Sequence, residues 1–154
     1  MILRNLYACL FLCTITFLFS SFVETKNRNP YVSGGGTAIE GGARSTFVFN
    51  AVQTPNGVVG YLTYHLRAFN TRFQMQLDCM EIRGNRATVR GTVTSVSGEN
   101  IPSYIFPGSS ASFTVEDNGN GGSKDRISDV VFGANCNDDL DTYIQLQGNV
   151  SIRQ

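Results

Sequence analysis

The chain has 154 residues, and its 12 Lys and Arg residues balance its 12 Asp and Glu residues. A formal charge of zero argues against a nucleic-acid binder and against a binder of anionic membranes, because both depend on clustered positive charge. Charged residues make up only 16% of the chain, which also contains 16 Gly, 11 Phe and six Tyr. This composition indicates a single folded all-β domain rather than a disordered chain.

The N-terminal segment has the pattern of an export signal. Arg4 is the only charged residue before an apolar run from Leu6 to Val23 that contains no charge. A basic start followed by such a run predicts a cleaved signal peptide over residues 1–25, which leaves a single antiparallel β domain over residues 26–154. A retained membrane anchor is the alternative, since a spanning helix needs roughly 20 apolar residues. We therefore expect a secreted, periplasmic or cell-surface protein that meets a membrane only through an uncleaved N-terminal segment.

Apolar and polar residues alternate with a period of two in most of the remaining chain, which predicts strands rather than helices. In the run 71–82, for example, Phe73, Met75, Leu77 and Cys79 fall together on the face expected to point inward. The runs with this pattern are 43–53, 61–68, 71–82, 86–96, 110–117 and 144–152, with weaker strands expected over 31–40 and 126–132.

Short turn sequences join several of these runs. Residues 55–57 (PNG) and 83–85 (RGN) fit tight hairpins. About eight antiparallel strands with one polar face each are compatible with an up-and-down barrel or with a two-sheet sandwich. The scarcity of long crossovers favours the barrel, whose closure also removes exposed strand edges.

Two cysteines, Cys79 and Cys136, lie in the expected domain. An even number of cysteines in an exported protein favours a disulfide, and two buried free thiols are the alternative. The bridge would hold the loop 133–142, which is rich in Asp, against one end of the barrel or sandwich. A zinc site is not expected, because the chain has no CxxC motif and His65 is its only histidine.

The order of several short glycine-containing motifs resembles that of a known family. The motifs include residues 33–36 (SGGG), 60–64 (GYLTY), 113–119 (FTVEDNG) and 148–150 (GNV). From Tyr31 onward the chain resembles the post-COAP family of small exported bacterial all-β domains, whose function is uncharacterised. The resemblance implies an exported accessory or binding module and carries over no activity. The pair Cys79 and Cys136 departs from the family pattern.

The loop 116–125 is the part of the domain richest in possible oxygen ligands. Asp117, Asn118, Asn120 and Asp125 are candidates for a calcium site, since calcium takes six to eight oxygens from such groups. The spacing does not match an EF-hand loop. A solvated turn stabilised by local side-chain bonds is the alternative interpretation.

Outward-facing basic residues suggest a second candidate site. Arg67, Arg72 and Arg90 are predicted on the outer face of neighbouring strands, where they would suit a carboxylated or sulfated glycan or a surface protein. Charges that serve only solubility or edge protection are the alternative. His65 is expected to point outward with no acid or nucleophile placed beside it, so no catalytic residue is assigned.

Three hypotheses about function follow. The first is a non-enzymatic exported β domain that acts as a binding or accessory module at the cell surface or in the periplasm. The second is a small barrel enzyme or ligand carrier with an internal cavity. The third is a structural or adhesive surface subunit that associates through sheet edges. Catalysis is disfavoured because the predicted inward faces are almost entirely apolar, and calcium is the only cofactor that the sequence suggests.

Overall fold

The structure is a computed structural model that describes residues 28–40, 42–119 and 124–154. The predicted signal peptide and Asn120 lie outside the described residues. Within the described ranges, no helix has the length and apolar character needed to span a membrane.

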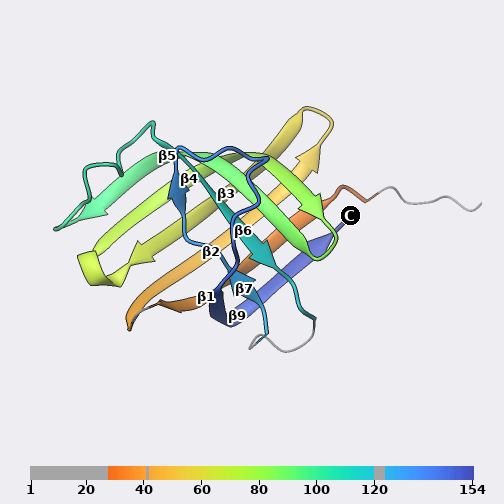
Figure 1. Ribbon diagram of the computed structural model, residues 1–154. Coiled ribbons are helices and arrows are strands. Elements are labelled where there is room, and N and C mark those ends of the chain that lie inside the picture. The colour runs from red at the N-terminus through yellow and green to blue at the C-terminus, as the bar shows by residue number, and fades with distance from the viewer. Residues whose placement is uncertain (1–27, 41, 120–123) are drawn as a thin grey trace, which may run out of the picture.

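The first half of the domain is a meander of long antiparallel strands (Figure 1). Each strand pairs with the next along the chain, as the alternating runs and hairpin turns predict. These strands are β1 (Tyr31–Glu40), β2 (Ala43–Thr54), β3 (Gly57–Leu66), β4 (Thr71–Arg83) and β5 (Arg86–Gly98).

The second half contains β6 (Ser110–Glu116), β7 (Arg126–Ile127), β8 (Val131–Phe132) and β9 (Ile144–Arg153). The hydrogen-bonded order is β5-β4-β3-β2-β1-β9-β7-β6, and β6 pairs in turn with β5. Eight antiparallel strands therefore close into a barrel, and β8 is an additional strand on β6. The all-β prediction is confirmed, and of its two architectures the barrel is the one observed.

The barrel interior is filled by the apolar residues that alternation places inward. Phe49, Phe73 and Phe113 are almost fully buried, and the rings of Phe49 and Phe113 meet edge to face with centroids 5.0 Å apart. Offset and edge-to-face contacts of this kind are the favourable geometries for aromatic pairs. The packed rings belong to the apolar core that borders the cavity at one end of the barrel.

Strand β4 changes face at Asp78. Leu77 and Cys79 pair with two consecutive residues of β5, so Asp78 is the extra residue of a β-bulge. Beyond the bulge Met80 and Ile82 pack against the core, and Cys79 points outward instead. The prediction that Cys79 extends the inward row of Phe73, Met75 and Leu77 is therefore wrong.

The disulfide between Cys79 and Cys136 is present, with the two Cα atoms 6.1 Å apart. Because Cys79 faces outward, the loop 133–142 crosses the outer wall of β5 and β6 and does not cover a barrel end (Figure 1). Ser112 and Thr114 point out of the barrel and are nevertheless fully buried beneath this loop. The outer face of the sheet is predicted to be exposed to solvent, but at this place the loop buries it.

Two carboxylates act as hydrogen-bond acceptors for β9 where β7 is too short to pair with it. Strand β7 pairs with β9 over only two residues. Farther along β9, the N–H of Val150 donates to Asp125 Oδ2 at 2.7 Å, and the N–H of Ile152 donates to Asp117 Oδ2 at 3.2 Å. These side chains replace the missing strand as acceptors for β9, in keeping with the rule that buried backbone N–H groups find partners.

Candidate functional site

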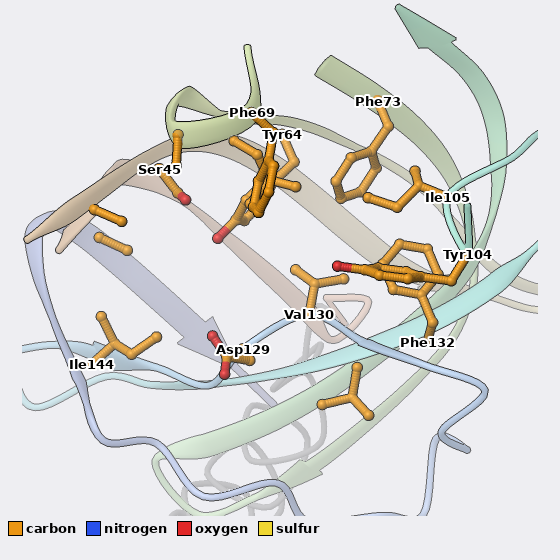
Figure 2. Close-up of a pocket in the computed structure, with 15 residues that line it drawn as sticks. Ser45, Tyr64, Phe69, Phe73, Tyr104, Ile105, Asp129, Val130, Phe132 and Ile144 are labelled. Carbon is orange, nitrogen blue, oxygen red and sulfur yellow. The ribbon is translucent and has the colours of Figure 1, made fainter. Parts of the chain in front are cut away.

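One end of the barrel contains a cavity of about 640 Å³. In the first half of the chain, its walls come from the end of β1, the start of β2, the end of β3, the 3-10 turn η1 (Arg67–Phe69) and the start of β4. In the second half, they come from the loop 99–109, the segment 129–132 and the start of β9. The residues that line it are shown in Figure 2. The tight turn at Pro55 lies at the opposite end of the barrel.

The cavity exists because the barrel wall is incomplete at this end. Strand β8 pairs with β6, and β9 pairs with β7 and β1, so no ladder joins β8 to β9 in the described part of the chain. Asp129 and Val130 lie between β7 and β8 and line the resulting space. A break in strand pairing has thus opened room that a continuous strand would fill.

Aromatic rings form a continuous wall from the core to the mouth of the cavity. Tyr64 stacks on Phe73 with ring centroids 5.3 Å apart, Phe73 meets Phe132 at 5.9 Å, and Phe132 meets Tyr104 at 5.3 Å. Tyr64 and Phe73 are buried, whereas Tyr104 is 55% exposed at the rim. Such a wall offers a large apolar contact area to a small molecule.

A few polar groups face the same space. Figure 2 shows the hydroxyl oxygens of Ser45 and Tyr64 and the carboxylate of Asp129 turned toward the hollow. Within the described part of the chain, Asp129 is the only charged side chain that lines the cavity, and its Oδ2 accepts a hydrogen bond from the hydroxyl of Tyr143. An apolar cavity with a few oriented polar groups has the composition typical of ligand sites.

The rim of the cavity exposes large apolar side chains to solvent. Phe69 on η1, Tyr104 in the loop 99–109 and Val131 on β8 all line the cavity and are exposed. Single exposed apolar residues are common, but residues gathered at the mouth of a pocket are typical of a binding site.

The barrel has a smaller hollow of about 270 Å³ at its other end. It is lined by Pro30, Gln53, Met80, Ile82 and Gln154, and no charged side chain is among them. Without an aromatic wall or a charged group, this hollow offers less to a ligand than the first cavity.

The predicted calcium ligands have structural roles. Asp117 Oδ1 accepts the N–H of Gly119 at 3.0 Å, and the fully buried Asp125 accepts the N–H of Asn118 at 2.9 Å with Oδ1. Both carboxylates therefore bind backbone donors with each of their oxygens. In the described ranges no group of three or more His, Cys, Asp or Glu residues is suited to a metal ion, and Asn120 falls outside those ranges. The calcium site stays a prediction.

The predicted basic patch is divided in the structure. Arg67 and Arg72 flank His65, whereas Arg90 lies about 20 Å farther along β4 and β5, by the usual rise per residue of a strand, and pairs with Asp78 at 3.2 Å. Burial, followed by the charges of Arg72 and Arg67, lowers the pKa of His65 below its usual value of 6.5. His65 faces outward as predicted, because Thr46 and Arg72 are its neighbours on the adjacent strands.

An ion-pair network holds the loop 133–142 to the barrel wall. The guanidinium of Arg86 contacts Glu116 at 3.3 Å and Asp139 at 2.8 Å, and Thr142 donates its hydroxyl to Glu116 at 2.6 Å. The hydrogen bond from Thr142 is the main cause that lowers the pKa of Glu116; burial opposes it, and a hydrogen bond from Asn118 and the charges of Arg86 and Arg126 add to it. This network and the disulfide hold the loop in place together.

The sequence allows an internal cavity as one hypothesis but does not indicate its position or its lining. Asp129 was not placed with the aromatic residues, because the lining comes from segments that only barrel closure brings together. Tyr104 offers the one sequence signal for this site, because a large aromatic residue in a Pro- and Gly-containing loop that forms no strand is unusual for a residue without a binding or packing role.

The fold and cavity define the class of the molecule: a closed eight-stranded antiparallel barrel with one open, aromatic-lined end. Neither a family model, nor a curated protein, nor a solved structure matches the chain. The resemblance to the post-COAP family therefore stays a prediction.

Proposed function

We propose that this protein is a non-enzymatic binding protein that holds a small apolar molecule in the open end of its barrel. The observation that carries this proposal is the aromatic-lined cavity of about 640 Å³, a volume within the usual range of roughly 300–1,000 Å³ for ligand pockets. This proposal combines two hypotheses from the sequence, the binding module and the ligand carrier with an internal cavity.

The lining favours binding over catalysis. Among the described residues around the cavity, Asp129 is the one carboxylate, and no His, Cys, Lys or Arg lies beside it. The hydrogen-bond partner of Asp129 is the hydroxyl of Tyr143, and His, the commonest general acid or base, is not among the lining residues that the structure describes. The cavity can therefore hold and orient a molecule more readily than transform it.

Closure of the barrel argues against an adhesive subunit that assembles through sheet edges. Each strand from β1 to β5 has a neighbour on both sides over part of its length, so little backbone edge remains for another chain, chiefly 78–83 of β4 and 94–98 of β5. The disulfide supports the expected location in an oxidising compartment, whether secreted, periplasmic or on the cell surface.

Titration with the neutral apolar dye Nile red tests the proposal. Saturable binding with one site per chain is expected from the increase in dye fluorescence. Ser45→Phe, which places a ring in the cavity, should weaken binding at least tenfold. Thr46→Phe is the matched control, since this neighbour on β2 faces outward and does not line the cavity.

Absence of saturable binding would refute the proposal. Equal binding by the Ser45→Phe and Thr46→Phe variants would place the dye elsewhere on the molecule. The melting temperature of each variant, followed by circular dichroism, shows whether the fold is retained.

A further inference from the structure

The charge that the described lining residues bring to the cavity is negative. Asp129 is the only charged residue among them; its Oδ2 accepts the hydroxyl of Tyr143, while its Oδ1 accepts no hydrogen bond from the described residues. Asp129 is exposed at the mouth, so a ligand can reach this oxygen without entering the core. A carboxylate at such a mouth attracts positive charge and repels negative charge.

The aromatic wall adds to this preference for positive charge. The rings of Phe73 and Phe132 meet at an interplanar angle of 63°, and those of Phe132 and Tyr104 meet at 61°. Rings at these angles turn their faces in different directions around the hollow, and Phe69 adds another ring to the lining. The negative face of an aromatic ring attracts ammonium groups within about 6 Å of its centre.

Basic side chains near the cavity point away from it. Arg67 and Arg72 act on His65 on the outer face of the barrel. Arg44 lies between Ala43 and Ser45 on β2, and only those two neighbours line the cavity. An anionic ligand would therefore lie beside Asp129 with no cation among the lining residues to neutralise it.

We propose that the cavity selects an apolar molecule that carries an amine or quaternary ammonium group. The apolar part of the ligand packs against the inner wall formed by Phe73 and Ile105, and its cationic group lies at the mouth near Asp129 and the ring of Tyr104. This inference rests on the proposed function and adds to it the chemical class of the ligand.

Three probes with the same alkyl chain and different head groups test the inference. Decyltrimethylammonium, decanol and decanoate compete with Nile red, each below the concentration at which it aggregates. We expect the ammonium probe to displace the dye at a concentration at least tenfold lower than decanoate, with decanol between them. Circular dichroism in the presence of each probe verifies that the barrel remains folded.

Substitution of the carboxylate locates the effect. Asp129→Asn should reduce the advantage of the ammonium probe over decanoate about tenfold and leave the affinity for decanol almost unchanged. Asp141→Asn is the control, because it removes the same charge from an exposed residue that does not line the cavity. It should leave the order of the three probes as in the unmodified protein.

The possible results separate this inference from the proposed function. Equal displacement by all three probes, or stronger displacement by decanoate, would overturn the selectivity and leave the binding function intact. An ammonium preference that survives Asp129→Asn would overturn the role of the carboxylate. If neither Nile red nor any probe binds, the proposed function fails as well.

Discussion

The two halves of the barrel are held together in different ways. Strands β1 to β5 have 10 to 13 residues each and pair along most of their length. In the half from β6 to β9, by contrast, β7 and β8 have two residues each. Strands β6 and β9 still form ladders with β5 and β1, but around β7 and β8 single side chains and one disulfide add links that backbone ladders provide in the first half.

This difference explains where the cavity lies. A regular ladder brings neighbouring strands to a spacing of about 4.8 Å and leaves no room between them. The interrupted strands near Asp129 have no such ladder, so the wall opens there and the aromatic residues behind it become accessible. The less regular half therefore provides the opening of the ligand site, and residues of both halves line it.

Removal of the disulfide should have the largest effect on stability. The bond between Cys79 and Cys136 closes a loop with a sequence separation of 57. In the chain-entropy model, loss of such a cross-link lowers the free energy of unfolding by about 4 kcal/mol. Guanidinium denaturation of the double variant Cys79→Ala/Cys136→Ala measures this loss.

The same double variant supplies the control for reduction. Dithiothreitol should destabilise the unmodified protein by a similar amount and have no effect on the variant. A loss below 1 kcal/mol would show that the hydrogen bonds of the loop 133–142 hold it without the bridge.

Asp125→Asn should have the next largest effect. The buried carboxylate accepts two backbone N–H groups, from Asn118 and Val150, and an amide can offer its single oxygen to only one of them. Hydrogen bonds to charged groups contribute about 1.5–3 kcal/mol each, so we expect a loss of about 2 kcal/mol. Urea denaturation measures it, and faster hydrogen exchange at Val150 would locate it.

Asp138→Asn is the matched control for this substitution. Asp138 is exposed and accepts one N–H, from Asn135 at 2.7 Å. A change of less than about 1 kcal/mol is expected, because solvent can replace the lost acceptor. Equal losses for Asp125→Asn and Asp138→Asn would contradict the view that Asp125 closes the barrel in place of a strand.

The sequence predicted the regular half well, because a period of two follows directly from the pleat of a half-buried strand. The predicted strand over 31–40 matches β1 in both bounds, and that over 71–82 differs from β4 by one residue. The face of Cys79 could not be predicted. A single extra residue at Asp78 reverses the alternation, and no feature of the local sequence marks it as a bulge.

The irregular half was less predictable because its contacts are long-range. Alternation correctly places Ser112 and Thr114 on the outer face but contains no information about the loop that covers them. The cavity depends in the same way on segments from β1 to β9 that meet only when the barrel closes. Local patterns predict which way a side chain points, and they do not predict what lies opposite it.

A more moderate effect is expected from Glu116 in the irregular half. Its pKa is below the usual 4.5, chiefly because of the hydrogen bond from Thr142. As the pH falls, the unfolded chain binds a proton at this residue before the folded protein does. The stabilisation is therefore complete above about pH 4.5 and is lost as the pH falls through the lower pKa of the folded state.

Glu116→Gln tests this dependence. At pH 7 the substitution should lower the free energy of unfolding by about 1 kcal/mol, the net contribution of an ordinary hydrogen bond. The difference from the unmodified protein, measured by urea denaturation, should shrink as the pH is lowered to 3. Thr142→Val, which removes the donor, should raise the pKa of Glu116. A difference that is the same at both pH values would contradict the ionic role of this residue.

The smallest effect is expected from His65, which lies in the regular half. Burial is the main cause that lowers its pKa, and Arg72 on the neighbouring strand adds to it. NMR titration should therefore give a pKa below 6.5. Arg72→Gln should raise this pKa without restoring 6.5, and Arg90→Gln should leave it unchanged because Arg90 is distant.

Because the folded protein binds the proton of His65 less readily than the unfolded chain, stability should increase slightly as the pH rises toward 6.5 and remain constant above it. His65→Gln should remove this slope and change the free energy of unfolding at pH 7 by no more than about 0.5 kcal/mol, as is usual for substitutions away from the core. Denaturation series at several pH values measure both quantities. A loss as large as that expected for Asp125→Asn would contradict the conclusion that backbone ladders, rather than single side chains, hold the regular half together.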